Sequence, residues 1–454
     1  MENKNISGSF VTDYAEDGIK GKCTVFYDFG WVGNTSQQYN HTLAKFCSQL
    51  CMLGYDDSFE DEKRSTGYEF TKPNLKAALE KMSFTDIVIN PRATRDQVNF
   101  FIAQREVDLP QGEYRLVFAG FIGSYRRQWY SNFDPYGWER EANDGKGYAG
   151  DAEKGRVHLG FADARSYVYE KLDNYLTSHK SDRETKYLLI GHSRGAATAN
   201  LLAGGILSEG RLGKTEIKAD NLFTYTFATP NAIILTDEEK SNPVFSRIYN
   251  IVNPEDYVTA VLPEAWGFTK YGTVYTLPSK SFFKPVTYEF YKNSMQKYYA
   301  KFRGNMAYTP FKKGIEKTAK ATRVLAEGIN GLEGFYYDKQ KELREMRTPF
   351  EYFKVTLCPY VAGVSNEEEQ KAKDEATKLI LASSYDPVAT SYTFRNLSKF
   401  FVEMEGIGSV TGGKISSTYF SDSHRAVAYC AYMLSLTKEA LIRDTDIEES
   451  EEDE

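Results

Sequence analysis

The chain has 454 residues, of which 41% are hydrophobic and 26% are charged, as is typical of globular domains. This composition excludes a largely disordered or collagen-like chain, and no run approaches the 18 consecutive apolar residues of a membrane-spanning helix. The formal charge of −7 is unevenly distributed, because residues 444–454 carry eight acids and no base. We therefore predict an acidic, disordered tail over residues 441–454.

The cysteine count and the N-terminal sequence limit the class of protein further. Five cysteines are too few for a disulfide scaffold, and Cys47 and Cys51 lack the additional ligands that a metal site needs. We expect core thiols, no metal and no cofactor. Residues 1–22 are polar and are predicted to be an irregular lead-in. They contain no apolar segment of a secretion signal, which favours a cytoplasmic location, or a secreted one if a leader has been removed.

Predicted strands and helices alternate along residues 23–280. Short apolar runs predict strands over residues 22–29, 113–121, 185–192, 221–230 and 245–254. Helical spacing of apolar residues predicts helices over 35–57, 162–179 and 196–210. This alternation predicts an α/β core with a doubly wound, mostly parallel sheet.

The sequence pattern changes after residue 280. Residues 281–395 contain several helical patterns, and we interpret them as an inserted helical cap whose helices include 314–329 and 367–385. The first part of this cap is rich in Lys, Arg, Tyr and Phe. One interpretation is a transient contact of the cap with a lipid surface. The favoured one is that the aromatic residues form the core of the cap and the basic residues its solvated face. No nucleic-acid motif accompanies the charge, so no nucleic-acid partner is expected.

The sharpest motif is the Gly-x-Ser-x-Gly sequence of residues 191–195. It stands between an apolar strand and a helix of small residues, which is the context of a tight strand-to-helix turn that exposes the serine hydroxyl. Gly191 and Gly195 leave room for the backbone in such a turn. Ser193 is therefore predicted to be a nucleophile; the alternative is a Gly/Ser helix start without chemical consequence.

A nucleophilic serine needs an adjacent base, and an imidazole base needs a carboxylate that fixes its tautomer. On an α/β-hydrolase sheet these residues follow in the order Ser, Asp or Glu, His. His424 is the only histidine after Ser193, and it lies in residues 396–440, which are predicted to return to the core and enter a helix. Asp256 directly follows a predicted strand, and the adjacent Glu255 is the competing acid. His192 is predicted to be structural.

Six sequence blocks in this order resemble the class 3 lipases, a fungal and bacterial family of α/β-hydrolases. The resemblance extends over residues 114–280 and 416–436. The blocks are LVFAG (116–120) with Trp129, VHLGF (157–161), LLIGHSRGAA (188–197), YTFATPNA (225–232), IVNPEDYVTAVLP (251–263) and SDSHRAVAY (421–429).

The resemblance implies a serine carboxylic-ester hydrolase that cleaves lipid acyl esters through an acyl-enzyme, with the triad Ser193, Asp256 and His424. It also implies that His158 is structural. Two alternatives remain open. One is a short-chain esterase, lysophospholipase or thioesterase with the same triad, and the other is a catalytically idle binding protein with a hydrolase fold.

The oxyanion hole is where the chain departs from the family. The backbone N–H of Arg194 is expected to be one donor. The family usually has Arg-Gly-Ser/Thr after the preceding strand, whereas this chain has Ala119-Gly120-Phe121. We therefore expect the N–H of Phe121 to be the second donor, with Ser124 as the alternative.

Overall fold

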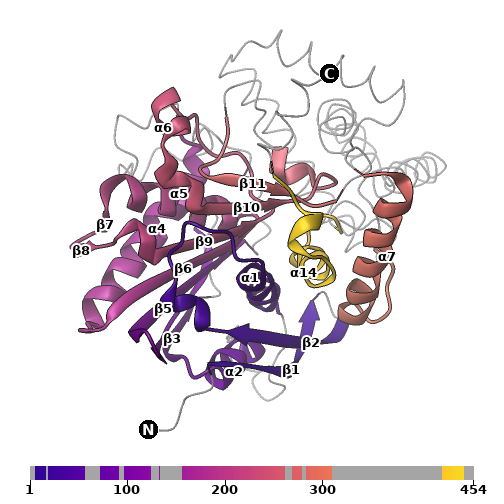
Figure 1. The fold of residues 1–454 in the computed structure, drawn as a ribbon, viewed down its shortest axis with the longest axis horizontal. Helices are drawn as coiled ribbons and strands as arrows, with labels where there is room; N and C mark the ends of the chain where they lie inside the picture. Colours follow the sequence, from indigo (N-terminus) through magenta and orange to yellow (C-terminus); the bar gives the residue numbers. More distant parts are fainter. Residues whose placement is uncertain are drawn as a thin grey trace, which may run out of the picture.

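The computed structural model describes residues 6–16, 19–56, 72–90, 97–123, 132, 156–260, 268–278, 283–308 and 422–443. Its main feature is an eight-stranded sheet with the order β12-β11-β10-β9-β6-β5-β4-β3 (Figure 1). The strands are β3 (Thr85–Asn90), β4 (Asn99–Leu109), β5 (Gly112–Ile122), β6 (Glu184–His192), β9 (Leu222–Phe227), β10 (Ile248–Val252), β11 (Thr273–Thr276) and β12 (Ile442–Arg443). The run from β5 to β11 is parallel, and the outer strands at both edges pair antiparallel. The predicted α/β fold with a mostly parallel sheet is confirmed.

Helices cover both faces of the sheet, as a doubly wound fold requires (Figure 1). One hydrophobic core joins the sheet to α1 (His41–Gly54), α2 (Pro73–Lys81) and α14 (Ala426–Ser435). The other joins it to α4 (Leu159–Ser178) and α5 (Arg194–Glu209). Strand β5 feeds both cores alternately, because successive side chains of a strand point to opposite faces. Short elements on the second side are α6 (Asp237–Ser241) and the two-residue strands β7 (Arg211–Leu212) and β8 (Thr215–Glu216).

The irregular lead-in predicted over residues 1–22 is wrong. Strands β1 (Ser7–Glu16) and β2 (Ile19–Asp28) form an antiparallel hairpin that is separate from the main sheet. In β2 the buried residues alternate, with Cys23, Val25 and Tyr27 facing inward. A hairpin with one buried face needs few apolar residues, and β1 leaves its first half exposed, which is why its polar sequence concealed a strand.

The predicted tail also begins too early. Leu441 is buried, and Ile442–Arg443 form β12, which pairs antiparallel with β11. The acidic residues 444–454 lie outside the described residues. Cys47 and Cys51 are buried in α1, and burial raises the pKa of both thiols well above the usual value, as expected of core cysteines.

The part of the predicted cap that the structure describes is mainly α7 (Pro285–Phe302). This helix packs against α14 and β2 (Figure 1). The cap helices predicted over 314–329 and 367–385 lie outside the described residues. No helix of the described part of the chain has the length and apolar character needed to cross a membrane.

Candidate active site

The serine of the Gly-x-Ser-x-Gly motif sits in a sharp turn between β6, which ends at His192, and α5, which begins at Arg194. Ser193 has φ 58° and ψ −128°, a strained conformation for a residue other than glycine. A Cβ atom on Gly191 would collide with the backbone of Gly195, and one on Gly195 would collide with the carbonyl of Phe121. The two glycines therefore permit the turn that projects the serine, as the sequence predicted.

Three residues far apart in the sequence form one hydrogen-bonded chain at this turn. Ser193 Oγ lies 2.8 Å from His424 Nε2, and His424 Nδ1 lies 2.9 Å and 3.0 Å from the two carboxylate oxygens of Asp256. A carboxylate only accepts hydrogen bonds, so the proton of a neutral imidazole belongs on Nδ1, and Nε2 accepts from the serine hydroxyl. The structure thus brings together the three residues that the chain order predicted.

The carboxylate of Asp256 is fully buried and held by two further donors. The Tyr429 hydroxyl donates to Oδ2 at 2.8 Å, and the backbone N–H of Val258 donates to Oδ1 at 3.0 Å. Burial raises the pKa of Tyr429 well above its usual value, with Asp256 adding to the shift, which keeps the hydroxyl protonated. Sequence reasoning missed this role; its only signal was a tyrosine five residues after His424, in the block that ends the family resemblance.

Glu255, the competing acid, points to other partners. Its two carboxylate oxygens accept hydrogen bonds from the hydroxyls of Tyr288 and Tyr308. Asp256 is therefore the acid that the geometry pairs with His424.

The other two histidines near the site are buried and neutral. His192 lies 2.9 Å from the Tyr55 hydroxyl through Nδ1, and burial lowers its pKa well below the usual value. His158 precedes α4, where its Nδ1 accepts from the N–H of Phe161, and its Nε2 lies 3.0 Å from the carbonyl of Asn132. Burial lowers the pKa of His158 to about 3, with a smaller contribution from the positive charge of Arg194. These contacts support the structural roles predicted for both residues.

The two expected oxyanion donors, Arg194 and Phe121, lie in different settings: one begins a helix and the other lies inside a strand. Arg194 is the first residue of α5, where backbone N–H groups point outward along the helix axis. Its buried guanidinium donates to the carbonyls of Gln97 and Gly160 and so holds the turn in place. Phe121 lies inside β5, in register with Phe100 of β4 on one side and Gly191 of β6 on the other. Because an amide in a strand paired on both sides points at a neighbouring strand, this position favours the alternative, Ser124, which lies outside the described residues.

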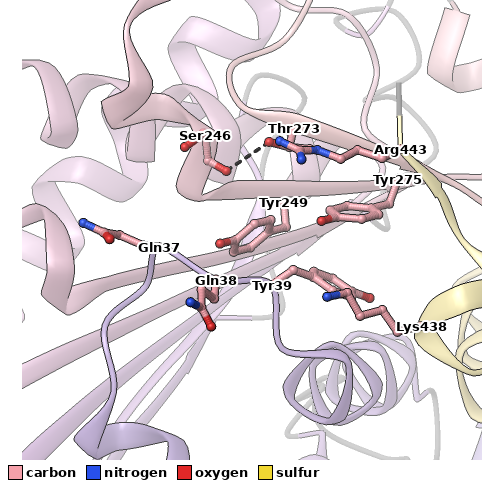
Figure 2. A pocket seen from close by; sticks show the side chains of 9 residues that line it. All are labelled: Gln37, Gln38, Tyr39, Ser246, Tyr249, Thr273, Tyr275, Lys438 and Arg443. Atoms are coloured by element: carbon pink, nitrogen blue, oxygen red, sulfur yellow. Dashed lines mark hydrogen bonds between the residues drawn. The ribbon is translucent and has the colours of Figure 1, made fainter. Parts of the chain in front are cut away.

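A cavity of about 220 Å³ lies elsewhere, beside β10, β11 and β12 (Figure 2). Tyr39 and Tyr275 stack in its wall with ring centroids 4.4 Å apart, and Lys438 and Arg443 also line it. None of the three triad residues lines this cavity, so it is not the space beside the serine hydroxyl.

Comparison with known proteins gives one family match. The model of the family Lipase (class 3) matches residues 117–266, a segment that contains Ser193 and Asp256 and ends before His424. The resemblance inferred from the sequence blocks is thereby confirmed for this part of the chain. No curated protein matches the chain.

Solved structures of fungal lipases are also similar to the chain. The native propeptide complex of Rhizomucor miehei lipase is 21% identical, with 53% of this chain and 68% of that chain covered and a TM-score of 0.32. The lipase from Rhizopus microsporus var. chinensis is 17% identical, with 61% and 80% covered and a TM-score of 0.33. A nonglycosylated Yarrowia lipolytica lipase is 16% identical, with 52% and 79% covered and a TM-score of 0.35. With scores this low, the fold assignment depends on the sheet itself and on the family match.

Proposed function

We propose that this chain, a carboxylic ester hydrolase by its match to the class 3 lipases, cleaves lipid acyl esters through Ser193, His424 and Asp256. The observation that supports this proposal most directly is the hydrogen-bonded series from the serine hydroxyl through the imidazole to the buried carboxylate. Within such a series the imidazole takes the hydroxyl proton, and the carboxylate holds the required tautomer.

The reaction runs in two halves. Ser193 Oγ attacks the acyl carbonyl while its proton moves to Nε2 of His424, and the backbone N–H of Arg194 donates to the developing oxyanion. His424 then protonates the leaving alcohol, and the acyl group remains on the serine. A water molecule, deprotonated by His424, hydrolyses the acyl-enzyme and releases the carboxylic acid. The second oxyanion donor is the backbone N–H of Phe121 or of Ser124, and we prefer Ser124 because Phe121 is paired on both sides within β5.

Helix α7 supports a transient contact with a lipid surface. Its outer face exposes Val286 at 84% and Phe290 at 66%, one helical turn apart. Lys284 precedes this pair and is also exposed. Apolar side chains flanked by lysine on a helix are typical of segments that lie at a lipid–water boundary. The opposite face buries a second set of residues, as the favoured interpretation of the cap expects: Tyr288, Met295, Tyr299 and Phe302.

Labelling of the wild-type protein with a fluorophosphonate probe tests the nucleophile, with Ser193→Ala as the control. We expect labelling of the wild type alone, together with hydrolysis of p-nitrophenyl esters of long acyl chains. A folded wild-type protein that is not labelled would support the idle binding protein instead. Hydrolysis restricted to short acyl chains would support the short-chain esterase.

A further inference from the structure

Helix α7 contacts the segments that carry both the acid and the base of the triad. The acid follows β10, and the base precedes α14. Neither α7 nor the hairpin β1–β2 lies in the segment that matches the lipase family. Both nevertheless reach the residues adjacent to Asp256 and His424 through buried or half-buried polar contacts.

On the acid side, the contact runs through Glu255, the peptide neighbour of Asp256. Tyr288 of α7 donates to Oε1 of Glu255 at 3.1 Å, and Tyr308, just beyond α7, donates to Oε2 at 2.7 Å. Both tyrosines are buried, and burial raises the pKa of both hydroxyls, so they remain donors. The carboxylate of Glu255 is thus held at both oxygens, by α7 and by the segment that follows it.

On the base side, the contact runs through Glu16 at the end of β1. Arg303, which ends α7, donates through Nη1 to Oε2 of Glu16 at 3.0 Å and to the Glu16 carbonyl at 3.1 Å. The other oxygen, Oε1, lies 3.3 Å from Nη1 of Arg425, the residue after His424. The side chain of Arg303 is only 1% exposed, and those of Glu16 and Arg425 are 12% and 11% exposed.

The network is balanced in charge. Asp422 lies 3.5 Å from Arg425, so two arginines and two acids are collected around the turn that presents the imidazole. Charges buried to this degree hold their geometry because separating any pair leaves an uncompensated charge away from water. An ionic cluster of this kind resists displacement of the turn on which His424 stands.

We propose that Glu255 and Glu16 are positioning residues that fix the Asp256–His424 pair against α7. This inference rests on the proposed function. Triad chemistry tolerates little displacement, and a misplacement of 1 Å costs about a hundredfold in rate. The two catalytic segments are 168 residues apart in sequence, and α7 gives them a common support.

Variants that leave the charge unchanged test the proposal. The double substitution Tyr288→Phe and Tyr308→Phe removes both hydroxyls from Glu255, and Arg303→Lys replaces the two-acceptor contact with Glu16. Tyr298→Phe is the matched control, because Tyr298 lies on α7 and is 38% exposed. Two measurements are made on each folded variant: the rate of the acylation burst with a p-nitrophenyl ester, and the low-field NMR resonance of the His424 Nδ1 proton.

We expect the burst rate to fall about tenfold in the double variant and in Arg303→Lys, with KM little changed, since a displacement well below 1 Å costs less than a hundredfold. The Nδ1 proton resonance should move upfield in both variants and stay in place in Tyr298→Phe. If the resonance does not move in either folded variant, the proposal is overturned, even where the rate falls. The resonance does not depend on turnover. It therefore reports the contact between Asp256 and His424 even if the wild-type protein is not labelled by the fluorophosphonate probe. If the double variant does not fold, Arg303→Lys and the single Tyr308→Phe decide the question by the same two readings.

Discussion

Replacing Asp256 by asparagine should force the imidazole into the wrong tautomer. One oxygen of the carboxylate accepts from the backbone N–H of Val258, which cannot turn away, so the asparagine oxygen must take that place. Its NH₂ group then occupies the place of Oδ2, 2.9 Å from His424 Nδ1. The shorter of the two contacts of Nδ1 then faces a donor, which favours an Nδ1 that accepts from the NH₂ group and an imidazole proton on Nε2. An Nε2 that carries a proton cannot take the proton of the serine.

The magnitude follows from that tautomer. A triad with its acid converted to the amide loses about 10⁴-fold in kcat, or roughly 5.5 kcal/mol of transition-state stabilisation. The Tyr429 hydroxyl, which donates to Oδ2, loses the acceptor of its proton in the variant. Since a hydrogen bond to a charged group contributes about 1.5–3 kcal/mol, a similar loss of stability should accompany the loss of rate.

The assay is the steady-state hydrolysis of a p-nitrophenyl ester, with thermal unfolding as the check that the variant is folded. Asp237→Asn is the matched control, since it makes the same chemical change on an exposed side chain of α6. It should retain far more activity than Asp256→Asn. An Asp256→Asn protein that keeps more than about a tenth of wild-type kcat would refute the tautomer argument, because about 10⁴ is expected.

Three further predictions follow from the same site. Ser193→Ala and His424→Ala should each abolish nearly all turnover, and the double variant should be no worse than either, because the two residues act as a unit; additive losses in kcat would contradict this. Burial lowers the pKa of His158 to about 3 and that of His192 well below its usual value, whereas the unfolded chain titrates near 6.5. As the pH falls below about 6.5, the unfolded state therefore binds more protons, and the free energy of unfolding should drop by about 1.4 kcal/mol per pH unit for each histidine. In denaturant titrations of His158→Gln, the slope of the free energy of unfolding against pH should be smaller by the equivalent of one proton. An unchanged slope would contradict the assignment. Phe290→Ser should slow hydrolysis of an emulsified lipid ester and leave that of a dissolved ester unchanged; equal losses on both would argue against the lipid contact.

The parts of the site that the sequence predicted are those that local geometry or chain order determines. The turn at Ser193 needs two glycines at fixed positions, and their spacing is visible in the sequence. His424 could be selected because it is the only histidine that follows Ser193. By contrast, the contact of Glu255 with Tyr308 depends on packing between segments 53 residues apart, and no local pattern announces it.

Two strands that the sequence did not predict lack the continuous apolar run of a central strand. Strand β3 is exposed or half-buried along its whole length and lies at one edge of the sheet, so it lacks the apolar run that marks a central strand. Strand β1 belongs to the separate two-stranded sheet. It is exposed over its first residues, so it also lacks such a run. The central strands β6 and β9 are buried almost throughout, and apolar runs in the sequence predicted both of them. Strand β4, however, is buried along most of its length and was not predicted either, and β2 was predicted although only one of its faces is buried, so burial accounts for only part of the difference.

Helix α14 positions the imidazole of His424 beside the serine, so activity is expected to depend on how this helix packs in the core. Residues 426–433 are all buried, so α14 is enclosed on every side, with α1 and α7 as its main helical neighbours. His424 stands two residues before this helix and cannot move independently of it. Removing volume from α14 or from its neighbours should therefore displace the base as well as lower stability, since interiors are close-packed and transmit strain. In this chain a core substitution far from the substrate is expected to act on catalysis through the position of one side chain.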